Sequence, residues 1–163
     1  MKNLVITIAM VFAFGITMAG ENKSSIAEQS GSFTLNIEGL TSDNGLVKVL
    51  LYNNELGFPT EEQYAFINYN LDLGKDCSSA TIQTLPFGSY AIYVYHDENG
   101  NEKFDKNWAG NPKEAYGYSN MQKESIVNPA FSQSLFTFSQ DGQTLKIDLV
   151  HSKKGKDGAL TNK

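Results

Sequence analysis

The stretch Ser89-Tyr90-Ala91-Ile92-Tyr93-Val94-Tyr95-His96 decides the fold class of this chain. Aromatic and β-branched side chains fill it, and these residue types favour the pleated backbone of a β-strand. Alternate side chains of a strand point to opposite faces, so one face would hold Tyr90, Ile92, Val94 and His96, and the other Ala91, Tyr93 and Tyr95. Because both faces are largely apolar, this strand is predicted to lie in the interior of a β-sandwich.

Two further strands are predicted on the N-terminal side. Phe33, Leu35 and Ile37 alternate with polar residues, which is the period of a strand with one face buried and one in water. Residues 46–52 are apolar on both faces apart from one lysine. The turn signal Asp43-Asn44-Gly45 between the two segments predicts that they form a hairpin.

Weaker signals continue along the chain. Residues 60–63 are typical of the cap of a short helical turn, and residues 64–73 show a mixed apolar pattern. Strands are also predicted at residues 79–85, 134–138 and 145–150, with an Asp141-Gly142 turn between the last two. Between Asp97 and about Asn128 the hydrophobic period disappears, which predicts a long loop.

The composition agrees with a domain built from sheets. The chain has 163 residues, of which 40% are hydrophobic and 19% charged, and it contains 10 Phe and 8 Tyr. A chain of this length has room for one hydrophobic core. We therefore predict an all-β fold, a two-layer antiparallel β-sandwich of about seven strands with Ig-like architecture and one long loop after a central strand.

The first residues are typical of a secretory signal peptide. Lys2 precedes an apolar run over residues 4–16, and Thr17-Met18-Ala19 supplies small residues before a predicted cleavage after Ala19. The run is shorter than the roughly 20 residues of a membrane span, and no Cys follows it for a lipid anchor. We expect an exported protein, periplasmic or extracellular, that does not insert into a membrane once residues 1–19 are removed.

The remainder divides into a leader, a domain and a tail. Residues 20–31 are predicted to be a flexible leader, residues 32–150 the β-sandwich domain, and residues 151–163 a flexible polar tail. The net charge of −5 and the scattered lysines argue against a nucleic-acid partner. Cys77 is the only cysteine, so no disulfide can form within the chain, and we expect it to be a small buried hydrophobe.

The predicted long loop begins with regularly spaced oxygen-bearing side chains. Asp97, Asn99, Asn101 and Asp105 occupy relative positions 1, 3, 5 and 9, and Lys103 at position 7 offers its backbone carbonyl. Calcium takes about six to eight hard oxygen ligands, and a tight loop points alternate residues at one centre. The spacing therefore indicates a calcium-binding loop.

Two positions depart from an EF-hand. Glu102 stands at position 6, where the sharp turn requires Gly, and Trp108 stands at position 12 in place of a bidentate Glu. Glu114 is the candidate for the missing carboxylate, and the expected affinity is weak, about 10⁻⁴ to 10⁻³ M. The alternative is that Asn99-Gly100 is an ordinary polar turn, because Asn, Asp and Gly favour turns for backbone reasons alone.

Other aromatic residues of the predicted loop are candidates for contact with a ligand or partner. Trp108, Tyr116 and Tyr118 either fold back as a lid over one end of the sandwich or stay exposed to bind a glycan or a protein. His96 lies beside Asp97, but the other His is in the tail, and no nucleophile or phosphate-binding motif is present. We therefore predict no catalytic residues and no enzyme activity.

Several motifs occur in an order that resembles a known family. They are Leu85-Pro86-Phe87-Gly88-Ser89-Tyr90-Ala91-Ile92, His96-Asp97-Glu98-Asn99-Gly100-Asn101 with Asp105, Gly110-Asn111-Pro112 with Glu114, and Gly117-Tyr118-Ser119-Asn120. Over about residues 33–150 the chain resembles exported bacterial proteins known only as domain of unknown function 2141. Such families usually have Phe where this chain has Tyr118.

The resemblance implies export and a transthyretin-like or carboxypeptidase-regulatory-like sandwich, and it implies no activity. If the loop is the hallmark of the family, Asp97, Asn99, Asn101 and Asp105 are the positions to carry over. The resulting hypothesis is a non-enzymatic accessory or binding module, with an unknown protein or glycan partner, whose weak Ca²⁺ site orders an aromatic lid at residues 108–120. The alternatives are a carbohydrate or small-ligand binding protein that uses the loop aromatics and, third, an uncharacterised enzyme.

Overall fold

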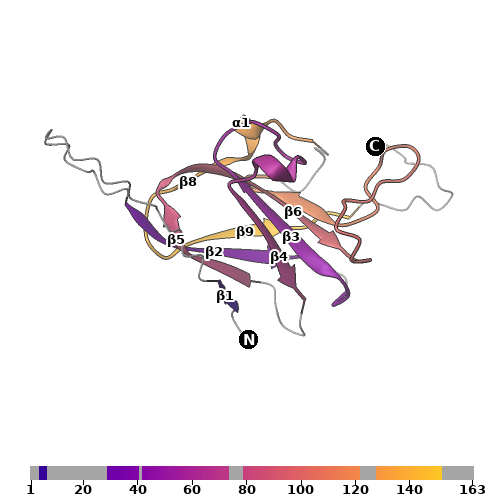
Figure 1. The fold of residues 1–163 in the computed structure, drawn as a ribbon, viewed down its shortest axis with the longest axis horizontal. Coiled ribbons are helices and arrows are strands. Elements are labelled where there is room, and N and C mark those ends of the chain that lie inside the picture. The colour runs from indigo at the N-terminus through magenta and orange to yellow at the C-terminus, as the bar shows by residue number, and fades with distance from the viewer. Residues whose placement is uncertain (1–3, 7–28, 41, 74–78, 122–127, 152–163) are drawn as a thin grey trace, which may run out of the picture.

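A computed structural model describes residues 4–6, 29–40, 42–73, 79–121 and 128–151. The leader and tail predicted from the sequence lie mostly outside these residues, as does Cys77. Two sheets pack together as a β-sandwich, which confirms the predicted all-β class (Figure 1). No helix among the described residues is long and apolar enough to cross a membrane.

The larger sheet is built around the stretch that decided the fold class. Strand β6 (Gly88–Asp97) pairs on one side with β3 (Leu46–Tyr52), which in turn pairs with β4 (Ile67–Asp72). Its other side pairs with β8 (Leu135–Phe138) and then with β7 (Tyr116–Tyr118). All these pairings are antiparallel, and β6 is the central strand that its two apolar faces predict.

The smaller sheet contains parallel pairs, which the sequence did not predict. Its order is β1 (Leu4–Ile6), β5 (Ser79–Pro86), β2 (Ser30–Glu38) and β9 (Gln143–Asp148). β2 is antiparallel to β5 but parallel to β9, and β1 is parallel to β5. β1 lies inside the segment predicted to be a signal peptide, so it belongs to the chain before any cleavage.

The predicted hairpin of residues 33–37 and 46–52 is wrong. β2 and β3 lie in different sheets, and so do β8 and β9, so each turn signal marks a crossing between the layers. β3 is buried on both faces and needs partner strands on both edges, which β4 and β6 supply. Gly45 ends the crossing from β2 to β3 at a φ of +76°, where its backbone lies against that of Asp97 and leaves no space for a Cβ.

The chain between β6 and α1 (Phe131–Ser134) is also not one continuous loop, because it contains β7. The Ser119 hydroxyl oxygen accepts a hydrogen bond from the Ile92 N–H at 2.8 Å, and the hydroxyl donates to the Ser134 carbonyl. The side-chain amide of Asn120 donates to the Leu135 carbonyl at 3.1 Å. These bonds fasten β7 and β8 to the same edge of β6.

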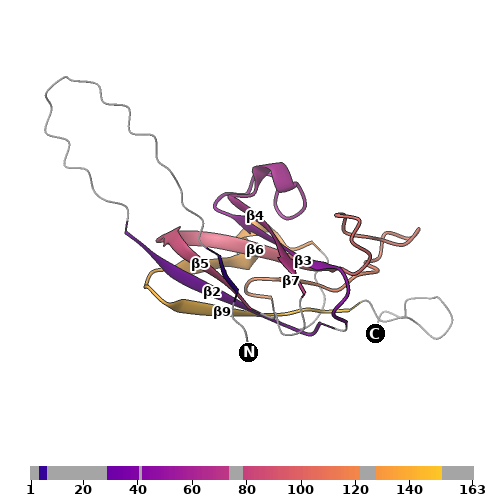
Figure 2. The ribbon, with the colours of Figure 1, turned by 60° about the horizontal axis from the view of Figure 1, so that its bottom comes forward.

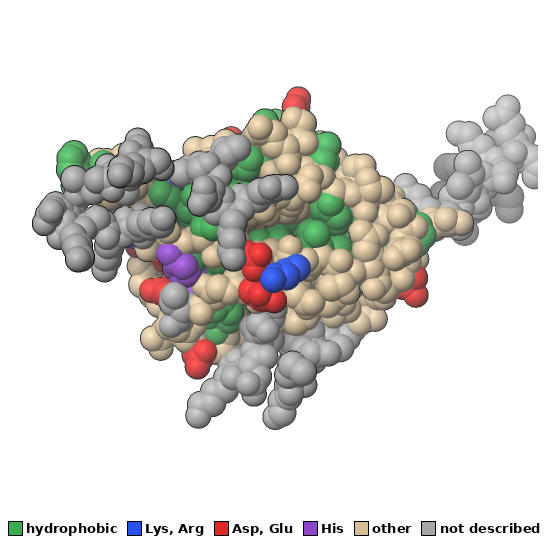
Figure 3. All heavy atoms as spheres, turned by 180° about the vertical axis from the view of Figure 1, so that it is seen from behind, with side chains coloured by type: hydrophobic (Ala, Val, Ile, Leu, Met, Phe, Trp, Pro, Cys, Tyr) green, Lys and Arg blue, Asp and Glu red, His purple; other side chains and the backbone are tan. Residues whose placement is uncertain are grey.

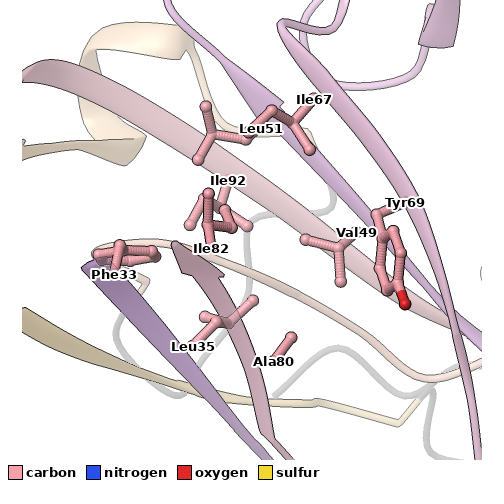
Figure 4. A pocket seen from close by; sticks show the side chains of 9 residues that line it. All are labelled: Phe33, Leu35, Val49, Leu51, Ile67, Tyr69, Ala80, Ile82 and Ile92. Carbon is pink, nitrogen blue, oxygen red and sulfur yellow. The ribbon is translucent and has the colours of Figure 1, made fainter. Parts of the chain in front are cut away.

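The hydrophobic core lies between the two sheets. It is made of aliphatic and phenyl side chains from both layers, among them Phe33, Leu35, Val49, Leu51, Ile82, Ile92 and Phe138. Figure 4 shows side chains of the two sheets pointing toward one another around a void of about 20 Å³. Because its lining is almost wholly apolar, a water there would lack partners, and the void is a packing defect rather than a ligand site.

A second cluster covers the outer face of the larger sheet. Its buried members are Leu50, Tyr52, Tyr93, Tyr95, Tyr116 and Tyr118. Segments outside the sheet pack on it, including residues 58–65 between β3 and β4 and Phe104 in the connection after β6. In Figure 2 the 53–66 connection stands over the sheet beside β4, and the connection after β6 projects from the end of the sandwich. We call this second cluster the tyrosine face.

One view of the surface shows how the charges are distributed. On the face in Figure 3, charged side chains are few, and apolar side chains lie in separate small groups among uncharged atoms. The described lysines on the smaller sheet include Lys146, which is paired with Glu38 at 2.8 Å and with Asp148 at 3.2 Å. The tyrosine face, by contrast, has a hollow bordered by charged residues.

Candidate functional site

The loop that follows β6 is folded around the carboxylate of Asp97. This side chain is fully buried, and its Oδ1 accepts hydrogen bonds from the backbone N–H groups of Gly100 at 2.8 Å and Asn101 at 3.2 Å. Its Oδ2 accepts the N–H of Glu102 at 2.6 Å. Such bonds draw the backbone into a tight ring around one carboxylate, which is the shape that a cation-binding loop needs.

The two asparagines continue this arrangement. Asn99 Oδ1 accepts the Asn101 N–H at 3.0 Å, and Asn101 Oδ1 accepts the Lys103 N–H at 2.9 Å. Their amide nitrogens both donate to Asp105, at 2.8 Å from Asn99 and 3.3 Å from Asn101. The structure therefore brings Asn99, Asn101 and Asp105 together through these hydrogen bonds.

Glu102 stands at position 6 of the loop and has a backbone conformation that normally requires glycine. Its φ is +59°, in the left-handed region, and Gly100 has a φ of +68°. A side chain other than Gly in this region costs about 1 kcal/mol or more. The loop thus keeps the sharp turn at position 6 despite the unfavourable residue, which shows that its hydrogen bonds outweigh the strain.

Glu114 reaches the loop from the segment that leads into β7. Its Oε2 accepts the Asp105 N–H at 2.9 Å, while its Oε1 is buried and has no hydrogen-bond partner. Only 6% of the residue is exposed. Burial raises the pKa of the Glu114 carboxyl, as do the nearby carboxylates of Asp97 and Asp105, whereas the N–H groups of Asp105 and Glu98 act in the opposite direction.

The donor set fits calcium only if uncharged oxygens join it. Among the described residues, no three Asp, Glu, His or Cys side chains are grouped closely enough to hold a metal by themselves. Rotation of the Asn99 and Asn101 amides would turn their oxygens toward Asp105 in place of the present N–H groups. Glu114, whose Oε2 accepts the Asp105 N–H, brings a further carboxylate to this part of the loop.

The aromatic residues predicted as a lid lie elsewhere. Tyr116 and Tyr118 are in strand β7 and are buried in the tyrosine face, whereas Trp108 is 99% exposed. Hydrophobic periodicity missed β7 because the strand has only three residues. Phe104, on the loop itself, covers the tyrosine face, with ring centroids 5.8 Å from Tyr93 and 5.4 Å from Tyr95.

A hollow of about 390 Å³ lies beside Phe104 on the tyrosine face. Its lining comes from three places in the chain, namely the sheet (Leu50, Tyr93, Tyr95), the η1 region (Thr60, Glu62) and the loop (Glu102, Lys103, Phe104, Lys106). The short helix η1 (Glu62–Tyr64) holds one wall. Sequence reasoning missed this hollow, because no local pattern shows that residues 60–62 and 102–106 lie opposite each other.

Glu62 and Lys48 form an ion pair next to the hollow. Lys48 is only 6% exposed, and its Nζ lies 2.8 Å from Glu62 Oε2. Burial tends to raise the pKa of Glu62, but hydrogen bonds from Lys48, Asn68 and Tyr95 outweigh it and lower the pKa from 4.5. Glu62 therefore stays ionised and neutralises the buried lysine.

His96 points into the sandwich, on the face opposite Asp97. It is fully buried, its Nε2 lies 2.8 Å from the Asn44 carbonyl oxygen, and its Nδ1 lies 3.7 Å from Glu98 Oε1. The carbonyl contact requires a proton on Nε2. These contacts fasten the 43–45 crossing to the end of β6 and give the histidine a structural role.

Comparison with known proteins identifies a family and no activity. A family model described as "Uncharacterized protein conserved in bacteria (DUF2141)" matches residues 35–146. This confirms the resemblance seen in the sequence motifs, although export and a transthyretin-like topology stay predictions. No curated protein and no solved structure shows a significant match.

Proposed function

The chain belongs to the DUF2141 family of uncharacterised bacterial proteins, and we propose that it is an exported, non-enzymatic binding module regulated by calcium. In this proposal the Asp97–Asp105 loop and Glu114 bind one Ca²⁺ weakly. The ion fixes the loop and, with it, the segment that covers the tyrosine face. The partner is an unknown protein or small ligand.

The observation that supports calcium most is the buried Oε1 of Glu114, which accepts no hydrogen bond of ordinary length and angle; the Glu98 N–H stabilises the carboxylate only through a weaker contact. An ionised carboxylate loses hydration on burial, and an oxygen without a partner is unfavourable unless a cation or donor meets it. This oxygen belongs to a carboxylate that accepts the Asp105 N–H and feels the charge of Asp97. A Ca²⁺ at this point would offset the mutual repulsion of the three carboxylates.

The present hydrogen bonds explain why the affinity would be weak. The Asp97 oxygens already accept three N–H groups, and Asp105 accepts two amide N–H groups. Calcium must displace the bonds to Asp105 before the amide oxygens can coordinate. We therefore expect a dissociation constant in the range of extracellular modules, about 10⁻⁴ to 10⁻³ M.

Phe104 connects the ion site to the rest of the domain. It precedes Asp105 directly, and its ring packs on Tyr93, Tyr95 and Tyr116. Any change in the position of Asp105 therefore moves an aromatic ring on the tyrosine face. In this proposal Phe104, rather than Trp108, is the residue through which calcium orders the cover.

The test is the melting temperature of the full chain in millimolar CaCl₂ and in EDTA. Calcium at 100 times its dissociation constant should add about 2.7 kcal/mol, a rise of several degrees for a domain of this size. Trp108, the only tryptophan, reports separately whether the 105–114 segment becomes ordered, through its fluorescence.

The matched variants are Glu114→Gln, which keeps the shape of the side chain, and Glu55→Gln, which neutralises an exposed residue between β3 and β4. The calcium response should vanish in Glu114→Gln and persist in Glu55→Gln. If the wild-type melting temperature is the same in calcium and EDTA, or if both variants respond equally, the loop is an ordinary polar turn and the proposal fails.

A further inference from the structure

We propose that the hollow on the tyrosine face binds a small ring-containing carboxylate, such as an aromatic acid. This inference goes beyond the calcium proposal, because it assigns a ligand to side chains that are not candidate oxygen donors. The hollow has a volume of about 390 Å³, within the range of small-molecule sites.

The floor and the inner wall suit a flat ring. Tyr93, Tyr95 and Leu50 come from the rigid centre of the larger sheet, and Phe104 closes one side. Aromatic side chains bind rings in offset or edge-to-face arrangements, which add stabilisation beyond simple burial. Because β3 and β6 are paired along residues 46–52, the positions of these side chains are fixed by the backbone.

The charge at the rim favours an anion. Lys103 and Lys106 both line the hollow and are exposed, and neither forms an ion pair with a described residue. Lys106 Nζ lies 5.7 Å from the centroid of Phe104, at the edge of the aromatic wall. Two glutamates also line the hollow. Glu62 is neutralised by Lys48, whereas Glu102 is exposed and forms no ion pair with a described residue, so two lysines face one uncompensated carboxylate and the net charge of the rim is positive.

One residue of the lining carries a buried polar group without a partner. The Tyr93 hydroxyl is among the buried side-chain atoms without a hydrogen bond, although Tyr93 is 1% exposed and borders the hollow. Burial, together with the neighbouring tyrosines and Glu114, raises the pKa of Tyr93, so its proton is retained and available for donation. A carboxylate is the strongest acceptor for such a donor.

The probes are 4-hydroxybenzoate, its neutral counterpart 4-hydroxybenzamide, and methyl glucoside, each titrated by calorimetry into the full chain. We expect 4-hydroxybenzoate to bind more tightly than both neutral compounds. The double variant Lys103→Gln/Lys106→Gln should weaken its binding about tenfold, because two exposed charge contacts are lost. Lys113→Gln, an exposed lysine that does not line the hollow, is the matched control and should bind as the wild type does.

The Tyr93→Phe variant tests the hydroxyl. The variant keeps the ring and removes only the hydroxyl, so any loss of affinity for 4-hydroxybenzoate measures the lost hydrogen bond. We expect the dissociation constant to rise about three- to tenfold. Three results would overturn the proposal. They are no binding of 4-hydroxybenzoate, equal affinity of Lys103→Gln/Lys106→Gln and Lys113→Gln for it, or tighter binding of methyl glucoside. Preference for the sugar would instead support the glycan alternative.

Each titration is run in EDTA and in calcium, so that the two proposals fail separately. Binding of 4-hydroxybenzoate without any calcium effect on melting temperature would overturn only the calcium proposal. A calcium-dependent rise in melting temperature without binding of the acid would overturn only this inference. Tighter binding in calcium would show that the loop couples the two sites through Phe104.

Discussion

The two faces of the five-stranded sheet are buried in different ways. The inner face carries aliphatic side chains such as Val49, Leu51 and Ile92, which pack against the other sheet. The outer face carries tyrosines and Lys48, which are covered by connecting segments. Aliphatic groups need only contact, whereas buried hydroxyl and ammonium groups also need hydrogen-bond partners.

This difference indicates which face is suited to binding. The inner face borders a void of about 20 Å³, whereas the outer face has a hollow of about 390 Å³ and, among its lining residues, the unpartnered Tyr93 hydroxyl. Its cover comes from loops, which can move relative to the sheet more easily than one sheet can move relative to another. The comparison therefore connects the stability of the domain with the inner face and supports the outer face as the place of the proposed ligand.

The largest expected effect is in the core between the inner face and the smaller sheet, where Phe33 of β2 lies. Phe33 is fully buried and its ring centroid lies 5.3 Å from Phe136 and 5.5 Å from Phe138. Phe33→Ala should lower the free energy of unfolding by about 3 to 5 kcal/mol, through lost burial and the cavity left behind. Urea denaturation measures this change.

The counterpart on the outer face is Phe58→Ala. Phe58 is only partly buried and packs on Tyr52 at 5.3 Å between ring centroids, so the loss should be about 1 to 2 kcal/mol. Equal losses in the two variants would show that the cover is as rigid as the core, contrary to the comparison.

An effect of similar size is expected from the ion pair that covers part of the outer face. Glu62→Gln would leave the buried Lys48 without its counter-ion and should cost about 2 kcal/mol at neutral pH, as for a hydrogen bond between charged groups. The pKa of Glu62 is lowered in the folded state, so its contribution is complete above its ordinary value of 4.5 and is lost as pH falls through the folded pKa.

The measurement is the free energy of unfolding of wild type and Glu62→Gln between neutral pH and pH values below 4.5. The gap between them should close in acid. Glu61→Gln changes the exposed neighbour and should match the wild type at every pH. A gap that is independent of pH would mean that Glu62 acts through packing alone.

The smallest effect concerns the loop. Glu102→Gly would relieve the left-handed backbone at a φ of +59° and should stabilise the domain by about 0.5 to 1 kcal/mol, after the added flexibility of the unfolded chain is deducted. Lys103→Gly, at a neighbouring position without positive φ, should destabilise it. A loss of stability in Glu102→Gly would show that the Glu102 side chain is itself needed.

Much of the fold could be predicted from local patterns. The alternation at Phe33, Leu35 and Ile37 and the apolar stretch at residues 89–96 correspond to β2 and β6, since burial of one or two faces imposes a period on the side chains themselves. The oxygen spacing of the Asp97–Asp105 loop also corresponds to a turn closed on Asp97. These features depend on neighbours in the chain.

Strand pairing could not be predicted in the same way. The Asp43-Asn44-Gly45 turn gave the same signal as a hairpin turn, yet it connects two sheets. Pairing β2 with β9 joins residues more than a hundred positions apart, so no pattern within one short segment specifies it. A turn motif specifies the local backbone and does not specify the partner strand.

By itself, the sequence determined the all-β class, the central strand and the oxygen-rich loop, because each follows from periodicity or spacing within a short segment. Only the tertiary structure decided that Glu114 approaches Asp105, that Phe104 rather than Trp108 covers the sheet, and that Lys48 is paired with Glu62. Each of these contacts joins separate segments, and packing against the sheet brings them together. The candidate ion site and the hollow therefore exist only in the folded chain.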